Sequence, residues 1–166
     1  PVDDDDGRTV MHTRGVFSNI NGLQLDHELI DANGVWSYRD KVWSFEGHSG
    51  GLHDWHEWAQ PGAFIVFDEF QKAWPPRPNG APVPPDVQAL DTHRHMGVDF
   101  VLLTQNPLNV DRHVLGLVDR HLHIRRVANS AVAIVYEWDH ASRSFLYKNA
   151  VTRSPWRYDK KADKLY

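Results

Sequence analysis

Two apolar runs that end abruptly in polar residues stand out in the pattern of this chain. The first run, residues 63–67, is followed directly by Asp68 and Glu69, and the second, residues 99–103, leads through one threonine to Gln105. An unbroken apolar run of this length, bounded by turn residues, is typical of a strand buried on both faces of a parallel sheet. The pattern therefore predicts two central strands whose polar ends lie at the same edge of the sheet.

Helix signals separate and follow these strands. A proline-rich stretch, residues 74–84, cannot continue a helix or a strand ladder, because proline lacks the amide hydrogen that both require. Pro85 then suits the first position of a helix predicted to run to Met96, with Gly97 as its left-handed stop. A second capped helix is predicted over residues 109–118.

Shorter elements are predicted around this unit. They are a strand over 15–20, a strand pair over 35–46, a short helix over 52–59, and strands over 121–127, 132–138 and 144–150, of which the last two form a hairpin. Between residues 63 and 127 the order is strand, helix, strand, helix, strand, which is typical of a parallel sheet with right-handed crossovers. The expected fold class is α/β, with a mainly parallel sheet flanked by helices and a C-terminal β-hairpin extension.

Composition narrows the class of protein. The chain has 166 residues, of which 41% are hydrophobic, and it contains 7 Trp and 7 Phe, which suits one folded domain with a substantial core. The absence of cysteine excludes disulfides and thiolate metal sites. A net charge of −4 disfavours a generally basic surface for nucleic acid.

Charge also differs between the two ends of the chain. Four consecutive aspartates, Asp3–Asp6, lie near the start, whereas residues 153–166 carry five Lys or Arg against two Asp. We expect residues 1–14 to form a disordered or irregular segment and 15–152 to form the folded domain. Residues 153–166 are expected to form a basic tail that leads toward a membrane segment.

A pair of acids at the end of a buried strand is the arrangement called Walker B in P-loop NTPases. There the Asp helps to hold Mg²⁺, and a following Glu polarises the attacking water. The pattern predicts a P-loop NTPase-like sheet in which Asp68 binds the Mg²⁺ of ATP through water and Glu69 is catalytic. The alternative is that the two carboxylates only form a polar turn after a buried strand.

Two further polar residues are candidates for contact with phosphate. On the predicted helix, Arg94 projects between the apolar positions Val87 and Leu90, and a buried guanidinium requires an anionic partner. Arg94 is either catalytic, as an arginine finger in its own site or a neighbour's, or it pairs with a carboxylate such as Asp91 or points to solvent. Gln105 either orients water or contacts the γ-phosphate from the end of its strand, or it is only a polar strand end.

One element of an ATP site is missing from the sequence. No GxxxxGK[ST] phosphate loop occurs, so the chain by itself is expected to bind ATP poorly or not at all. The 11 histidines raise a rival hypothesis, a metal-dependent hydrolase, although none of their spacings reproduces the HExxH pattern of zinc hydrolases.

Several motifs together resemble the zonular occludens toxin (Zot) family of filamentous-phage assembly ATPases. They are Ser18–Leu23, Trp58, Pro61–Lys72, Trp74–Arg77, Leu90–Asp99, Leu103–Pro107 and Leu117–His123. In this resemblance Asp68 matches the Walker B Asp, Glu69 the acid that follows it, and Gln105 a sensor-like position, while Arg94 lies in the family's His-Arg-His segment.

The resemblance implies an ATP hydrolase that acts at the cytoplasmic face of the host bacterial inner membrane, with a membrane segment downstream. Its implied partners are further copies of itself in a homo-oligomer, phage coat or secretion-channel proteins, and phage single-stranded DNA. In the family the Walker A loop lies upstream of the strand at 15–20, which implies that this fragment is inactive alone. The alternative is a non-enzymatic interaction or toxin module on the same fold.

Overall fold

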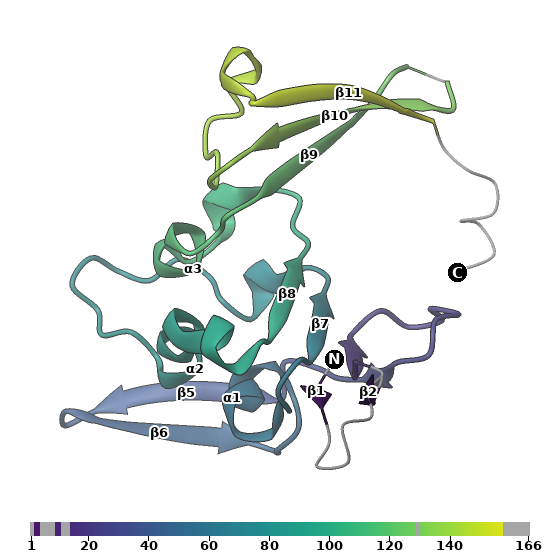
Figure 1. The fold of residues 1–166 in the computed structure, drawn as a ribbon. Coiled ribbons are helices and arrows are strands. Elements are labelled where there is room, and N and C mark those ends of the chain that lie inside the picture. Colours follow the sequence, from purple (N-terminus) through teal and green to yellow (C-terminus); the bar gives the residue numbers. More distant parts are fainter. Residues whose placement is uncertain (1, 4–8, 11–13, 129, 158–166) are drawn as a thin grey trace.

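A four-stranded parallel sheet lies at the centre of the computed structural model, which describes residues 2–3, 9–10, 14–128 and 130–157 (Figure 1). Its strand order is β4-β3-β7-β8, and all three pairings are parallel. The strands are β3 (Val16–Ser18), β4 (Glu28–Leu29), β7 (Phe64–Phe67) and β8 (Asp99–Leu102). The predicted α/β class with a mainly parallel sheet is confirmed.

The two apolar runs form β7 and β8, as predicted. The strands pair in register, so that Phe67 lies opposite Leu102 and both strands run toward the same edge of the sheet. Ile65 is fully buried, as expected for a strand inside a sheet. Within the described residues β8 pairs only with β7, and Val101 and Leu103 each keep 39% of their surface exposed. β8 is therefore the last strand of the sheet in the described part of the chain, and its outer side is open to pairing with another strand.

Short helices connect and cover these strands. They are η1 (Leu52–Asp54), α1 (Trp55–Trp58), η2 (Phe70–Lys72), α2 (Pro85–Ala89), η3 (Leu90–Met96), η4 (Pro107–Asn109) and α3 (Arg112–Gly116), where η denotes a 3-10 helix. The helix predicted over 85–96 starts at Pro85 and stops at Gly97, whose φ of 65° is left-handed, as predicted. It changes from α to 3-10 at Leu90, which the apolar pattern does not predict. In place of the single helix predicted over 109–118, the chain forms two short helices, η4, which ends at Asn109, and α3, which begins at Arg112.

A two-stranded antiparallel hairpin confirms the strand pair predicted over 35–46. Its strands are β5 (Gly34–Arg39) and β6 (Val42–Gly47). Trp36 lies opposite Phe45, and Tyr38 lies opposite Trp43, so four aromatic side chains share one face of the hairpin. The hairpin extends beside α1 and α2 (Figure 1).

A separate antiparallel sheet forms the C-terminal part of the domain. Its strands, in the order β11-β10-β9, are β9 (His121–Arg126), β10 (Val132–Trp138) and β11 (Thr152–Arg157). The strand predicted over 121–127 was expected to continue the parallel sheet, and this expectation is wrong. The reason lies in its alternating side chains: Leu122 and Ile124 share one face, and His121 and His123 share the other, a pattern that suits an antiparallel sheet.

The prediction of a strand over 144–150 is also wrong. This segment contains Phe145 in a left-handed conformation (φ 46°) and the 3-10 turn η5 (Tyr147–Asn149). The ring of Tyr147 packs on Tyr136 of β10, with centroids 4.5 Å apart. The segment thus covers a face of the sheet, and the hairpin partner of β10 is β11 instead.

The two ends of the chain are described in part. Val2–Asp3 (β1) pairs antiparallel with Thr9–Val10 (β2) within the segment predicted to be irregular, most of which lies outside the described residues. The first five residues of the predicted basic tail, 153–157, belong to β11, and 158–166 lie outside the described residues. None of the helices in the described ranges combines the length and apolar character needed to span a bilayer.

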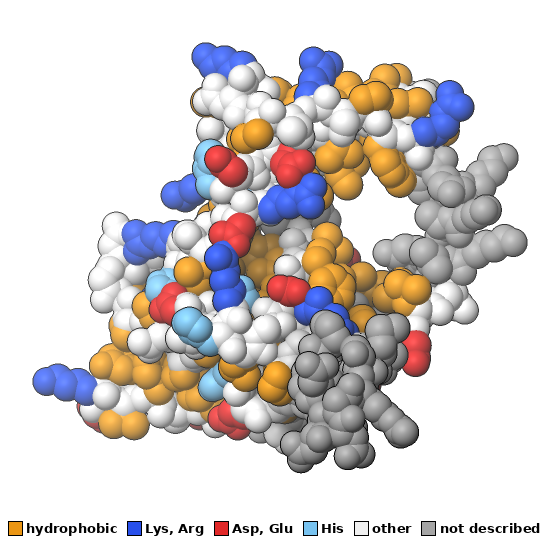
Figure 2. All heavy atoms as spheres, in the orientation of Figure 1, with side chains coloured by type: hydrophobic (Ala, Val, Ile, Leu, Met, Phe, Trp, Pro, Cys, Tyr) orange, Lys and Arg blue, Asp and Glu red, His pale blue; other side chains and the backbone are white. Residues whose placement is uncertain are grey.

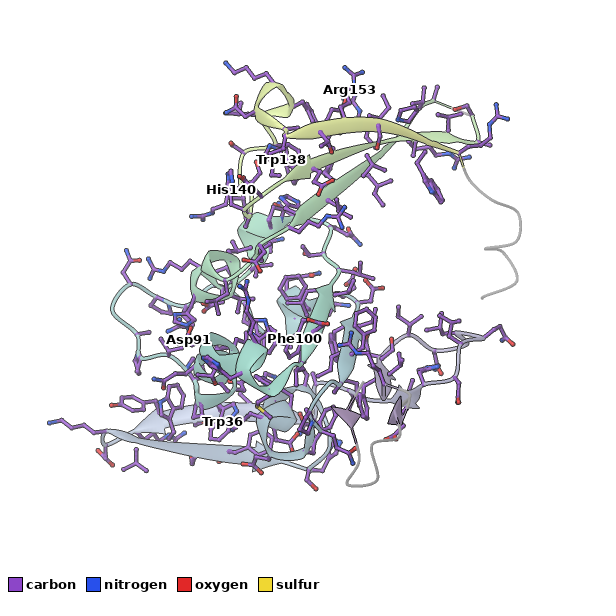
Figure 3. All side chains as sticks on the ribbon, in the orientation of Figure 1. Trp36, Asp91, Phe100, Trp138, His140 and Arg153 are labelled. Atoms are coloured by element: carbon purple, nitrogen blue, oxygen red, sulfur yellow. The ribbon has the colours of Figure 1, made fainter. Side chains whose placement is uncertain are left out.

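The core of the domain joins the parallel sheet to the helices that cover it. Trp55, Ile65 and Val98 are fully buried, and the ring of Trp55 packs edge-on against Phe100, with centroids 5.0 Å apart. Phe100 belongs to β8 (Figure 3). On the molecular face shown in Figure 2, acidic and basic side chains are intermixed rather than gathered into one basic patch.

Candidate functional site

The predicted pair of acids lies where β7 leaves the sheet. Asp68 follows the last residue of β7, and Glu69 adopts a left-handed conformation (φ 54°) that turns the chain into η2. This conformation is uncommon for a residue with a side chain, and it is often found where a site constrains the backbone. The turn leaves both carboxylates at the carboxyl edge of the parallel sheet.

Asn19, at the end of the neighbouring strand β3, holds this turn in place. Its Nδ2 donates to the carbonyl oxygen of Asp68 at 2.9 Å, and its Oδ1 accepts from the backbone amide of Asp68 at 2.7 Å. Oδ1 of Asp68 accepts in turn from the backbone amide of Glu69 at 2.8 Å. Asn19 is absent from the residues predicted for the site, although a polar side chain directly after a neighbouring parallel strand is a signal that indicates it.

Glu69 is the centre of a cluster of three side chains. Nε2 of Gln105 donates to Oε1 of Glu69 at 2.8 Å, and Nζ of Lys72 lies 2.7 Å from Oε2 of Glu69. The side chain of Glu69 is 31% exposed and that of Lys72 is 75% exposed. The structure therefore brings together Glu69 and Gln105 from the ends of adjacent strands, as their positions in the sequence predict. Lys72 is a member that the sequence prediction misses.

The partners of Glu69 determine its protonation state. The hydrogen bond from Lys72 and the positive charge of Lys72 lower the pKa of Glu69 below its usual value, burial opposes this, and the hydrogen bond from Gln105 adds to the lowering. The same contact with Glu69 raises the pKa of Lys72. Glu69 is therefore an ionised carboxylate at neutral pH, which is the form that accepts a proton from water.

Replacing Lys72 with Met should raise the pKa of Glu69 toward its usual value, because the strongest stabilising partner of the carboxylate is removed. The pKa of Glu69 is lower in the folded than in the unfolded state, so its contribution to stability is present at neutral pH and is lost as the pH falls through the lowered pKa. An NMR titration of the Glu69 carboxyl carbon measures the change, with Lys148→Met as the matched control. An identical Glu69 titration in both variants would show that Lys72 does not control this pKa.

A cavity of ≈ 470 Å³ lies beside the cluster, and Asn19, Asp31, Asp68, Glu69 and Lys72 are among the residues that line it. Mg²⁺ takes oxygen ligands and usually keeps several of its waters, so an exposed aspartate beside an open cavity fits its requirements. No group of three or more His, Asp or Glu side chains in the described ranges is arranged to hold a metal ion. A Mg²⁺ here would therefore take most of its ligands from water and phosphate, with Asp68 acting through water.

Arg94 and the Glu69 cluster lie at opposite ends of the parallel strands. It belongs to η3, which ends just before β8 begins, whereas Gln105 follows the end of β8. Because β7 and β8 are parallel, Arg94 lies at the opposite edge of the sheet from Glu69. One chain does not bring the two residues together, and a catalytic role for Arg94 toward a neighbouring chain stays a prediction.

The prediction that Arg94 faces the buried side is wrong, and the change of helix type explains why. In an α-helix, Arg94 would lie about 40° around the axis from Leu90. In a 3-10 helix the same four residues turn the side chain to about 120° from it. The Arg94 side chain is accordingly 62% exposed and forms an ion pair with Asp119. The predicted partner Asp91 instead lies 2.9 Å from Nε2 of His113.

The histidines form pairs and packing contacts of a different kind from a metal centre. Nδ1 of His53 lies 2.6 Å from Oδ2 of Asp86, and both side chains are buried. His123 packs against the ring of Phe145 with centroids 4.5 Å apart, and burial lowers the pKa values of His121 and His123. These contacts among the described residues give the hypothesis of a metal-dependent hydrolase no support.

The geometry defines a mixed α/β domain whose parallel sheet presents Asp68, Glu69 and Gln105 at one edge. The model of the family described as zonular occludens toxin (Zot) matches residues 5–166, so the chain belongs to the Zot family. The resemblance inferred from the motifs is confirmed.

Two curated relatives agree with this assignment. The chain is 34% identical over 134 residues to the putative assembly protein ORF301 of Pseudomonas phage Pf3, covering 79% of this chain and 40% of that protein. It is 29% identical over 175 residues to the zona occludens toxin of Vibrio cholerae, covering 92% of this chain and 44% of that protein. The chain thus spans less than half the length of these relatives.

A solved structure agrees with the fold over nearly the whole chain. The N-terminal domain of zonular occludens toxin from Neisseria meningitidis superposes with a TM-score of 0.76 at 30% sequence identity. The match covers 99% of this chain and 83% of that structure. The chain therefore has the fold of a Zot N-terminal domain.

Proposed function

We propose that this chain is the ATPase domain of a phage assembly protein, with its hydrolytic site at the carboxyl edge of the parallel sheet. The observation that carries the proposal is the hydrogen bond of 2.8 Å between Gln105 and Glu69, which joins the ends of two adjacent parallel strands. A carboxylate and an amide held together in this way are suited to bind and orient a water molecule that contacts both of them. The Pf3 relative named as an assembly protein supports the biological setting.

In the proposed reaction Glu69 accepts a proton from the water that attacks the γ-phosphorus, while the bond between that phosphorus and the oxygen of ADP breaks. Gln105, whose Nε2 donates to Glu69, would orient this water with its amide oxygen. The reciprocal hydrogen bonds between Asn19 and Asp68 would keep the turn from moving during the reaction. When bound, Mg²⁺ would neutralise charge that develops on the phosphate oxygens, and Asp68 would hold its water shell.

The phosphate-binding loop would have to come from outside residues 1–166, because the sequence contains no such loop. We propose that it follows a further parallel strand that pairs with the outer side of β8, the last strand of the sheet. Among the described residues the backbone groups on that side are unpaired, and Val101 and Leu103 of this segment are partly exposed. A strand added in parallel would end at the same edge of the sheet as β7 and β8, so a loop after it would lie near Glu69 and Gln105.

Assembly around this site is part of the same proposal. Arg94 is exposed and lies at the opposite edge of the sheet, so any contact it makes with a nucleotide would be to that of a neighbouring copy in a homo-oligomer. Attachment to the cytoplasmic face of the bacterial inner membrane, through a segment beyond this chain, would bring the oligomer to coat or secretion-channel proteins. Phage single-stranded DNA is a further partner compatible with such a machine.

Turnover of ATP by the complete protein tests the proposal. Asp68→Asn should raise the Mg²⁺ concentration needed for hydrolysis by about tenfold, because a neutral amide holds the water shell of the ion less well. Asp99→Asn is the matched control, since Asp99 lies at the opposite end of β8 and pairs with Arg14. A complete protein that neither binds nor hydrolyses ATP would instead favour a non-enzymatic interaction or toxin module.

A further inference from the structure

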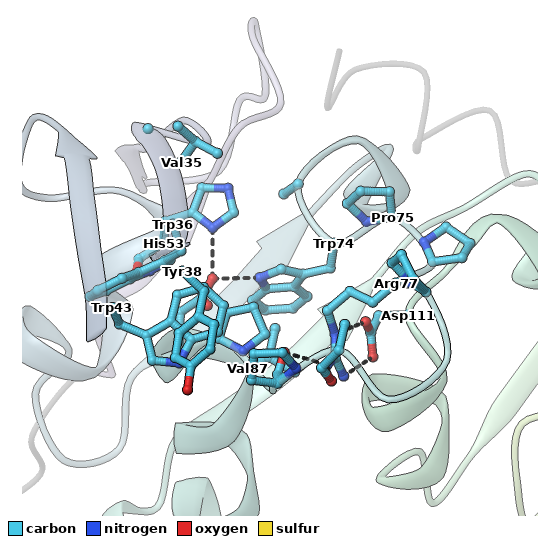
Figure 4. A pocket seen from close by; sticks show the side chains of 18 of the residues that line it. Val35, Trp36, Tyr38, Trp43, His53, Trp74, Pro75, Arg77, Val87 and Asp111 are labelled. Atoms are coloured by element: carbon cyan, nitrogen blue, oxygen red, sulfur yellow. Dashed lines mark hydrogen bonds and ion pairs between the residues drawn. The ribbon is translucent and has the colours of Figure 1, made fainter. Parts of the chain in front are cut away.

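A second cavity lies away from the proposed ATP site, between the hairpin β5–β6 and the proline-rich loop that follows η2 (Figure 4). Its volume is ≈ 540 Å³. In Figure 4 the aromatic side chains of the hairpin lie on one side of it, the Arg77–Asp111 pair lies on the other, and Trp74 lies between them. Nothing in the proposed hydrolytic reaction uses this space.

Aromatic rings form much of the wall of this cavity. Trp36, Tyr38 and Trp43 come from one face of the hairpin, and Trp74 comes from the loop. Tyr38 packs on Trp43 with ring centroids 4.9 Å apart, yet it remains 42% exposed. The faces of Trp and Tyr rings carry negative potential and attract cations within about 6 Å of the ring centroid.

A buried carboxylate lies at the floor of the cavity. The side chain of Asp86 is 1% exposed; its Oδ2 accepts from Nε1 of Trp74 at 2.8 Å and lies 2.6 Å from Nδ1 of His53. Its Oδ1 is buried and has no hydrogen-bond partner among the described residues. A buried carboxylate oxygen without a donor is costly, so this floor favours positive charge placed above it.

The other cationic side chains that line the cavity do not supply a donor to Oδ1 of Asp86. Lys72 pairs with Glu69, and Arg77 forms two hydrogen bonds to Asp111, at 2.5 and 3.1 Å. Among the described residues of the lining, both of these cations are therefore paired, and the side chains in contact with Asp86 are those of His53 and Trp74. Because Lys72 and Arg77 are paired, the described part of the lining offers no free Lys or Arg to a phosphate backbone, which argues against a nucleic-acid strand stacked on the aromatic rings.

We propose that this cavity binds a cationic side chain, lysine or arginine, of a partner polypeptide. The positive group lies over the aromatic faces and above Asp86, whose charge acts through a low-dielectric floor. The aliphatic stem of the partner side chain contacts the proline-rich loop. This inference is independent of ATP hydrolysis, because none of the residues at the carboxyl edge takes part apart from Lys72, which stays paired.

Short blocked peptides test the proposal on the intact chain. The peptides are acetyl-Gly-Lys-Gly-amide, its arginine analogue and its norleucine analogue, which keeps the stem and removes the charge. The readout is the indole N–H resonances of Trp36 and Trp74 in proton–nitrogen correlation spectra. We expect both cationic peptides to shift these resonances at millimolar concentrations and the norleucine peptide to require at least about fivefold more.

Two variants and one competitor complete the test. Tyr38→Ala should weaken binding of the lysine peptide about fivefold, because a cation–π contact is lost, whereas Val42→Ala, an exposed position of the same hairpin, should not change it. Asp86→Asn should also weaken binding where a thermal melt shows that it folds. Equal binding of the norleucine peptide, or tighter binding of an oligothymidine with the same indole shifts, would overturn the proposal.

Discussion

Replacing Glu69 with Gln in the complete protein should lower the rate of ATP turnover by about 10²- to 10⁴-fold while leaving nucleotide binding unchanged. Gln is almost the same size as Glu and still accepts the hydrogen bond that Gln105 donates at 2.8 Å, so the turn keeps its shape. It carries no charge and does not accept a proton from water. The substitution therefore slows the chemical step of hydrolysis rather than the binding of ATP.

The measurement is steady-state phosphate release together with nucleotide affinity in the same preparation. Glu57→Gln is the matched control, because Glu57 is an exposed glutamate of α1 that lies outside the site. A Glu69→Gln protein that turns over ATP as fast as the control would remove Glu69 from the mechanism. A protein that instead loses nucleotide binding would place Glu69 in the binding of ATP rather than in its hydrolysis.

Replacing Asp111 with Ala should destabilise the domain by about 3 kcal/mol or more, because it leaves the guanidinium of Arg77 without its charge partner. The side chain of Asp111 is 1% exposed, and that of Arg77 is 19% exposed. Asp111 also caps α3, since its Oδ1 accepts from the backbone amide of His113 at 2.8 Å. Arg77 in turn donates to the carbonyl oxygens of Ala81 and Pro82, so the same pair holds the proline-rich loop.

Urea unfolding compares this variant with two others. Asp111→Asn should cost less than Asp111→Ala, because its amide oxygen still caps α3. Asp91→Ala removes a half-exposed pair with His113 and should cost about 0–1 kcal/mol. If Asp111→Ala costs no more than Asp91→Ala, the buried pair is not what fastens the loop to α3.

The carboxyl edge of the sheet could be predicted because its signal is local. Each of β7 and β8 is an unbroken apolar run that ends in polar residues, and the helix between them requires a parallel crossover. Those two facts place Glu69 and Gln105 at one edge before any distance is known. Asn19 was not predicted, because its contact with Asp68 depends on β3 lying beside β7. The sequence of a short strand does not show which strand it pairs with.

Arg94 and the strand at 144–150 show where local patterns fail. The angular position of Arg94 depends on a change from α to 3-10 geometry at Leu90, which the spacing of apolar residues does not reveal. The segment around Phe145 and Tyr147 has strand-like composition, yet it does not form a strand. Its rings pack instead against His123 and Tyr136 of the neighbouring sheet. Tertiary packing overrides local preference in both cases.

The sequence by itself determined the class of the domain and which polar residues lie together at the carboxyl edge of the sheet, because burial demands continuous apolar runs and a parallel sheet collects its strand ends together. Only the tertiary structure decided which side chains meet across that edge, which way Arg94 points, and how the hairpin and the proline-rich loop enclose Asp86. These contacts join residues that lie far apart in the chain. They form only when the whole core is packed, since each is fixed by the burial of its neighbours rather than by the residues beside it in sequence.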